Sequence, residues 1–120
     1  LDLGCYEISL GDTIGAAAPE TTSLMLEAVL ALVPANKLAG HFHDTKGRAI
    51  DNIEVCLGYG IRTFDAAVGG LGGCPYAPGA KGNVATEAVV EMLVAKGFTT
   101  GIDAGKLSKA SSFALSLKGQ

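Results

Sequence analysis

The two histidines of the chain, His41 and His43, are two residues apart. Side chains at this spacing on a β-strand point to the same face, so both imidazoles can reach one ion. Neutral imidazole is a common ligand of divalent metals, and the pair therefore predicts a metal site. A pair of structural histidines that hydrogen-bond to neighbouring loops stays open as a second interpretation, because a bare His-x-His motif is not very specific. An ion that prefers octahedral oxygen ligands would also need carboxylates or amides and waters.

Asp12 is the strongest carboxylate candidate for such a site, because it follows a predicted strand beside the histidine strand. It could bind the ion directly or orient one of the ligands of the ion. Aspartates in loops more often close an Asx-turn or cap the loop, and this structural role is the alternative. Asp44 and Asp65 are weaker candidates, and Asp44 should point to the opposite face if the strand continues past His43.

A glycine-rich segment, residues 69–82, carries Cys74 and is followed by Asn83 and Glu87. A partly exposed thiol near a cation is a usable acid or base, so Cys74 is a candidate catalytic residue, and a small hydrophobe in a turn is the alternative. The amide oxygen of Asn83 could bind a metal, although its spacing favours a helix N-cap. Glu87 lies one turn later and could support Asn83 or interact with the helix N-terminus.

These residues require elements that bring them together, and the hydrophobic periodicity predicts such elements. Three segments are expected to be strands, at residues 5–10, 38–43 and 62–68. Each is followed by an amphipathic segment that we expect to be a helix, at residues 21–32, 48–59 and 83–96, and a last helix is expected at 103–117. Alternation of this kind is typical of a parallel α/β sheet, in which functional groups gather at the carboxyl ends of the strands.

Composition and charge exclude several classes of protein. Apolar residues make up 48% of the 120 residues and charged residues 18%, so we expect a packed core and no disorder. The net charge is −3 with no cluster of Lys and Arg, which argues against nucleic-acid binding. No apolar run approaches the ~20 residues of a membrane span. Three widely spaced cysteines favour a reducing compartment, and the first residue is Leu rather than Met, so we expect the chain to begin inside a longer protein.

Three motifs together resemble the 3-hydroxy-3-methylglutaryl-CoA lyase family, and they cover nearly the whole chain. They are SLGDTIG at 9–15, HFHDT at 41–45 and GLGGCPYAPGAKGNVATE at 70–87. The first two are shared with a wider superfamily of metal-dependent aldolase-like barrels, and the third is the specific one. The family fold is a TIM barrel, so the resemblance implies an α/β chain that forms the last three βα units of the barrel plus a C-terminal helix. Residues 1–120 would then be the C-terminal portion of a single lyase domain.

The resemblance also implies roles for the residues singled out above. His41, His43 and Asn83 match metal ligands, and the ion would be Mg²⁺ or Mn²⁺. Cys74 matches the catalytic cysteine of the family. Asp12 matches an acidic residue near the metal that affects activity, and Glu87 matches a residue close to the ligand asparagine. For Asn83, the family overrides the N-cap interpretation.

The implied reaction is a retro-Claisen cleavage of an acyl-CoA substrate, 3-hydroxy-3-methylglutaryl-CoA, to acetyl-CoA and acetoacetate, as in leucine degradation and ketone-body formation. Cys74 is expected to transfer a proton. The resemblance further implies a homodimer for the full-length protein, with no nucleic-acid or membrane partner. The compartment would be the cytoplasm in a bacterium and the mitochondrial matrix in a eukaryote.

The Arg-Asp pair that the family carries on its first strand is absent from this sequence, whose two arginines are Arg48 and Arg62. We therefore expect the isolated chain to have little or no lyase activity and weak metal binding at most. Two alternatives remain: another metal-dependent aldolase or acyl-CoA synthase barrel of the same superfamily, and a noncatalytic half-barrel that assembles with a partner.

Overall fold

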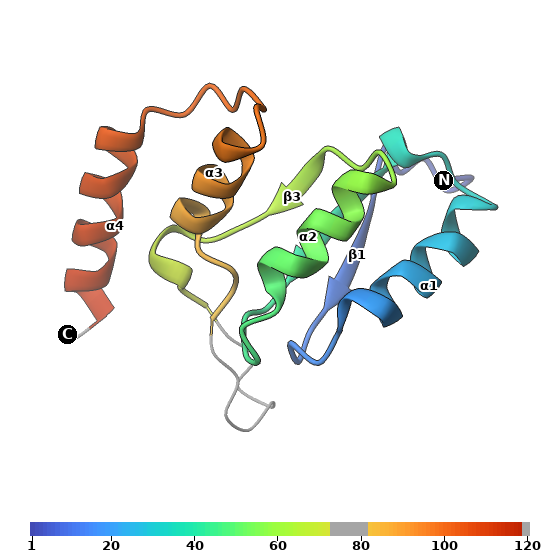
Figure 1. Cartoon of the computed structure of the whole chain (residues 1–120), viewed down its shortest axis with the longest axis horizontal. Coiled ribbons are helices and arrows are strands. Elements are labelled where there is room, and N and C mark those ends of the chain that lie inside the picture. Colours follow the sequence, from blue (N-terminus) through green and yellow to red (C-terminus); the bar gives the residue numbers. More distant parts are fainter. Residues whose placement is uncertain (73–81, 119–120) are drawn as a thin grey trace.

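A parallel three-stranded sheet lies at the centre of the chain. The computed structural model describes residues 1–72 and 82–118. The strands are β1 (Ile8–Asp12), β2 (Leu38–Phe42) and β3 (Thr63–Asp65), and their order in the sheet follows their order in the sequence. A helix follows each strand (Figure 1), so the predicted parallel α/β organisation is confirmed.

The helices form a row in which each contacts the next. They are α1 (Pro19–Leu30), α2 (Ala49–Gly58), α3 (Thr86–Ala95) and α4 (Ala104–Lys118). Figure 1 shows α1 and α2 on the same side of the sheet, with α3 beyond β3 and α4 at the end of the row. Two short 3₁₀ turns, η1 (Ala35–Lys37) and η2 (Val68–Gly70), complete the secondary structure of the described residues, and α4 packs against η2.

The core lies between the sheet and the helices, and it contains the predicted apolar faces. Leu26 of α1 and Ile53 of α2 are fully buried, and Val89 of α3 is 6% exposed. Apolar side chains at three- and four-residue spacing lie on one face of a helix, which is why the sequence pattern identified them. Two polar residues, Thr22 and Asn52, are also buried in this region, and the sequence pattern gave no indication of them.

The first strand is displaced from its predicted position. We expected a strand at residues 5–10 that ends before Gly11, but β1 begins at Ile8 and continues to Asp12. Parallel pairing with β2 explains the shift, because Ile8 is paired with Leu38 and Asp12 with Phe42. Asp12 is therefore the last residue of a paired strand rather than the first residue of a loop.

The third strand and the helix that follows it are shorter than predicted. β3 covers three residues of the expected 62–68, and η2 takes up the end of that segment. α3 begins at Thr86 rather than at Asn83, so the N-cap interpretation of Asn83 is wrong. The backbone of Asn83 instead forms an isolated antiparallel bridge with His43, which places it beside the end of β2.

The C-terminal helix begins as predicted. The Asp103 carboxylate accepts a hydrogen bond from the Lys106 N–H at 2.8 Å, which is the N-cap contact that the sequence indicated. Within the parts of the chain that the structure describes, no helix combines the length and the apolar character that a membrane crossing requires.

Candidate metal and catalytic site

The two histidine rings lie close together at the carboxyl end of β2. His41 is within the strand and His43 follows it directly. Their ring centroids are 5.4 Å apart, with the ring planes tilted by 46°. The prediction that both rings occupy the same side of the strand is confirmed. Rings at this separation can direct one nitrogen each towards a shared ion.

Each ring is oriented by a hydrogen bond to its Nδ1 atom. Nδ1 of His43 is 3.1 Å from the backbone carbonyl oxygen of Asp12, and Nδ1 of His41 is 3.0 Å from a carboxylate oxygen of Asp65. Carbonyl and carboxylate oxygens only accept, so Nδ1 carries the proton in both rings. The lone pair of each neutral ring is then on Nε2, which is the arrangement that metal-binding histidines use.

Asn83 reaches the same region through its backbone bridge with His43. Its N–H donates to the carbonyl of Gly72 at 2.8 Å, and its side-chain Nδ2 donates to the carbonyl of Leu71 at 3.0 Å. With Nδ2 occupied in this way, Oδ1 is the side-chain atom that can bind a ligand. An amide oxygen beside two imidazole nitrogens is a mixed donor set that suits a divalent cation.

The Asp12 carboxylate bonds to the loop that follows β1. Its Oδ1 accepts from the N–H of Ala16 at 3.0 Å and its Oδ2 from the N–H of Ala17 at 3.1 Å. These are the loop-capping contacts that we gave as the alternative to metal binding. The backbone carbonyl of Asp12 has a separate contact, because it is the acceptor for Nδ1 of His43.

The Glu87 carboxylate contacts the beginning of the glycine-rich segment rather than Asn83. Both of its oxygens lie 3.1 Å from the N–H of Gly69. Gly69 has a φ of 67°, a conformation that favours glycine, and its neighbour Gly70 has the same value. Glu87 therefore joins the N-terminus of α3 to η2, next to the stretch that Asn83 holds through Leu71.

Cys74, the candidate proton-transfer residue, lies outside the described residues. Its role stays a prediction from the sequence. Among the residues that the structure describes, no group of three or more His, Cys, Asp and Glu side chains is arranged to hold a metal ion. The set that the sequence predicted depends on an amide, Asn83, for its third donor.

Asp65 is the site residue whose role sequence reasoning underestimated. It was a weak carboxylate candidate, yet it is the acceptor for His41. The parallel register pairs His41 directly with Asp65, so this contact follows from strand alignment. The alignment of two strands more than twenty residues apart was not available from the sequence pattern alone.

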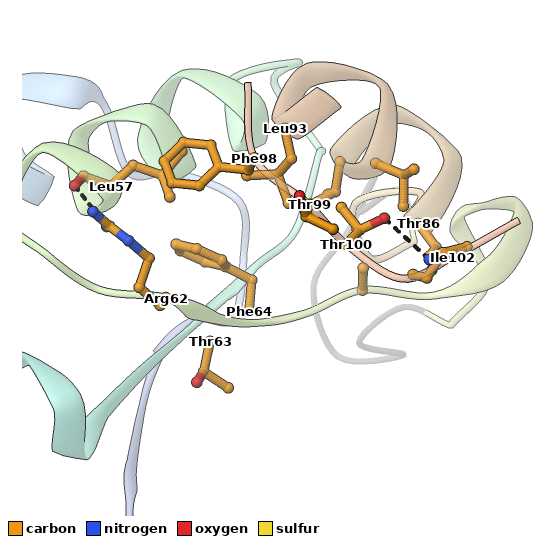
Figure 2. A pocket seen from close by; sticks show the side chains of 13 residues that line it. Leu57, Arg62, Thr63, Phe64, Thr86, Leu93, Phe98, Thr99, Thr100 and Ile102 are labelled. Carbon is orange, nitrogen blue, oxygen red and sulfur yellow. Dashed lines mark hydrogen bonds between the residues drawn. The ribbon is translucent and has the colours of Figure 1, made fainter. Parts of the chain in front are cut away.

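A cavity of about 470 Å³ lies beside β3, away from the histidines. Figure 2 shows Arg62 and Phe98 facing each other at its edge, with the guanidinium carbon 5.2 Å from the ring centroid. Arg62 also donates to the carbonyl of Leu57 at 2.9 Å. The candidate metal and catalytic residues within the described ranges do not line this cavity, which is therefore separate from the site.

Comparisons with known proteins agree on one family. A family model described as HMGL-like matches residues 1–114. The mitochondrial hydroxymethylglutaryl-CoA lyase of Arabidopsis thaliana is 60% identical over 112 residues, which is 93% of this chain and 24% of that protein. The chain thus spans about a quarter of the length of this relative.

Solved structures are similar over the whole chain. The crystal structure of the HMG-CoA lyase from Brucella melitensis superposes with a TM-score of 0.95 at 61% identity, covering 99% of this chain and 42% of that chain. An HMG-CoA lyase from A. baumannii, solved in complex with coenzyme A and 3-methylmalate, gives 0.90 at 42% identity, covering 99% and 39%. These superpositions confirm the predicted fold class, a partial TIM barrel. On the evidence of sequence and structure together, the chain belongs to the HMGL-like family.

Proposed function

We propose that this chain supplies the metal-binding part of a hydroxymethylglutaryl-CoA lyase, which cleaves 3-hydroxy-3-methylglutaryl-CoA to acetyl-CoA and acetoacetate. The observation that carries the proposal is the pair of histidines whose Nδ1 atoms are both occupied by acceptors. Nε2 of each ring is thereby available to a cation. Similarity to relatives named HMG-CoA lyases supports the choice of reaction.

The donor atoms fit a divalent cation such as Mg²⁺ or Mn²⁺. Two imidazole nitrogens and the amide oxygen of Asn83 leave room for oxygen atoms from substrate, water or a carboxylate. When bound, the cation supplies a Lewis acid and a template for the oxygen atoms of the substrate. The residues of this chain hold it, and the Nδ1 partners Asp65 and the Asp12 carbonyl keep the rings oriented.

The cleavage needs two proton movements. Removal of the proton from the tertiary hydroxyl lets the adjacent carbon–carbon bond break, and the electron pair of that bond passes to the carbon next to the thioester. That carbon is then protonated to give acetyl-CoA. We assign the second transfer to Cys74, whose thiol can donate a proton. Asp12 and Glu87 stay candidates for a catalytic role, although their carboxylates bond to backbone N–H groups of the neighbouring loops.

The remaining assignments follow from the same proposal. Residues 1–120 would be the C-terminal portion of one lyase barrel, acting on an acyl-CoA as a homodimer. Similar proteins carry names that place them in mitochondria or in the cytoplasm. We infer a cytoplasmic enzyme in a bacterial source and a mitochondrial one in a eukaryotic source.

An assay of the natural polypeptide that contains this chain tests the function. The protein is incubated with 3-hydroxy-3-methylglutaryl-CoA and Mn²⁺, and both products are quantified. Equal amounts of acetyl-CoA and acetoacetate are expected, with turnover lost after chelation and restored by added metal. Condensation of acetyl-CoA with a keto acid, in place of cleavage, would assign the chain to a synthase of the same superfamily. Absence of both reactions would favour a noncatalytic role.

A further inference from the structure

Asn52, on α2, is a buried polar residue that lies outside the proposed ligand set. Its exposed fraction is 1%, and both ends of its amide are hydrogen-bonded. Oδ1 accepts from the hydroxyl of Thr22 on α1 at 2.9 Å. Nδ2 donates to the backbone carbonyl of Ala17, in the loop between β1 and α1, at 3.1 Å. The side chain thus joins α2 to α1 and to that loop.

Both backbone polar groups of Ala17 form hydrogen bonds that anchor the loop at residues 12–18. The carbonyl of Ala17 accepts from Asn52, and its N–H donates to the Asp12 carboxylate. The carbonyl of Asp12 in turn accepts from Nδ1 of His43. Three hydrogen bonds, joined by the covalent structure of Ala17 and Asp12, therefore connect Asn52 on α2 to the ring of His43.

One residue of the loop, Gly15, is tightly packed. Gly15 is buried with a φ of 67°, and a Cβ added there would lie 2.6 Å from the Thr45 hydroxyl oxygen. The loop is held at its start by the paired strand β1, within itself by the Asp12 carboxylate, and from α2 by the Asn52 amide. Burying an amide costs free energy unless its polar groups are hydrogen-bonded. Both polar groups of the Asn52 side chain are bonded, one to α1 and one to the loop.

We propose that Asn52 is a positioning residue for the metal site: its amide ties the 12–18 loop to α2 and, together with the pairing of Asp12 in the sheet, holds the Asp12 carbonyl that orients His43. The effect on metal binding rests on the proposed function, whereas the effect on the loop does not. Loss of a direct hydrogen-bond partner of a metal ligand weakens metal binding about 10–100-fold, and Asn52, which acts on such a partner through Ala17, should have a smaller effect.

The test compares Asn52→Leu with Ile53→Ala in the natural polypeptide that contains the chain. Ile53 is the next residue on α2, is fully buried, and belongs to the apolar core. Its truncation should destabilise the helix by roughly 2–5 kcal/mol without touching the loop. Two readouts are taken in comparison with wild type: the Mn²⁺ dissociation constant, and the exchange ratio, which is the amide exchange rate of Ala16 and Ala17 in the metal-free variant divided by the wild-type rate. Exchange at Cys56 is recorded separately as the measure of global unfolding, because loop amides that exchange by local opening do not depend on it.

Asn52→Leu should weaken Mn²⁺ binding by about three- to tenfold, below the effect of losing a direct partner of a ligand, and should raise the exchange ratio of Ala16 and Ala17 by a similar factor. Ile53→Ala should leave both quantities within about twofold. Equal values for the two variants would overturn the proposal. If the wild-type protein binds no Mn²⁺, the proposed function fails, and the exchange ratio alone still decides the role of Asn52.

A second variant covers the case in which Asn52→Leu does not fold. Thr22→Val removes the hydroxyl that donates to Oδ1 of Asn52 and keeps the shape of the side chain. The amide then loses the contact that fixes its orientation, so the exchange ratio at Ala17 should rise in the same direction by a smaller factor. An exchange rate at Ala17 equal to that of wild type would overturn the proposal.

Discussion

His41 and His43 take their orientation from two different kinds of acceptor. The partner of His43 is a main-chain carbonyl, which no side-chain substitution at Asp12 removes. The partner of His41 is the Asp65 carboxylate, on a strand at the edge of the described sheet. The orientation of His43 therefore depends on where the backbone of the 12–18 loop lies, and that of His41 depends on a single side chain.

The buried thiol of Cys56 makes the free energy of unfolding depend on pH. Burial raises the pKa of its thiol from the ordinary 9.0 to about 11. The folded protein holds this proton more tightly than the unfolded chain does, so the stabilisation is complete below pH 9 and is lost as the pH rises towards 11. We expect the free energy of unfolding to fall by roughly 1–2 kcal/mol across that interval.

Denaturant unfolding of wild type and Cys56→Ala at several pH values from 8 to 11 measures this effect. The stability difference between the two proteins should be constant up to about pH 9 and should shrink above it. The comparison removes the contributions of tyrosines and lysines, which titrate in both proteins. A difference that stays constant over the whole range would show that the thiol does not titrate as inferred.

At the scale of elements, the loop after β1 and the bridge after β2 bring the site together. Asp12 ends β1, His43 follows β2, and Asn83 returns to pair with His43. Parallel strands place their carboxyl ends at one edge, which accounts for the first two positions. The third depends on a contact between residues forty positions apart.

Local pattern therefore predicted some features of the site and not others. The shared face of His41 and His43 follows from strand geometry, and the buried faces of the helices follow from their periodicity. The bridge of Asn83, the contact of Glu87 with Gly69 and the burial of Asn52 depend on how separate elements meet. No spacing within a single element carries that information. The resemblance to a family placed Asn83 among the expected metal ligands rather than at an N-cap, and its ligand role stays a prediction.

Two glycines with the same backbone conformation give a test of the 12–18 loop. Gly15 and Gly47 have φ values of 67° and 68°, but only at Gly15 would a Cβ meet neighbouring atoms, those of Thr45. Gly47→Ala should cost about 1–2 kcal/mol, the ordinary penalty of a left-handed alanine. Gly15→Ala should cost about 1–3 kcal/mol more, because the methyl group also overpacks the loop.

Thermal or denaturant unfolding of both variants measures this difference. The comparison holds the backbone penalty fixed, so the excess at Gly15 reports the packing of the loop against Thr45. Equal losses of stability in the two variants would mean that the loop has room to move. That result would also weaken the case for its role in orienting His43.

At the scale of the whole molecule, the described sheet has two strands with one neighbour each. β1 and β3 both pair with β2 alone among the described residues. The related HMG-CoA lyase of Brucella melitensis is more than twice as long as the region that superposes. The proposed site would take two histidines and an amide from this chain, and the Arg-Asp pair that the family resemblance implies is absent from the sequence.

A polypeptide of these 120 residues alone should therefore show little or no cleavage of 3-hydroxy-3-methylglutaryl-CoA and weak metal binding at most. The physical reason is that both members of the Arg-Asp pair are absent. The Asp would bind the metal ion, and the Arg would stabilise the enolate. The assay compares acetoacetate formation by this polypeptide with that of a full-length HMG-CoA lyase under the same conditions. Substantial turnover by the 120-residue polypeptide would refute the prediction.

Pulsed electron paramagnetic resonance can determine whether His41 and His43 bind a divalent cation through Nε2. The measurement uses the Mn²⁺-loaded natural polypeptide that contains the chain. We predict couplings to two imidazole nitrogens in the wild-type spectrum and to one in His41→Ala. A wild-type spectrum with bound Mn²⁺ but without coupling to nitrogen would contradict the account.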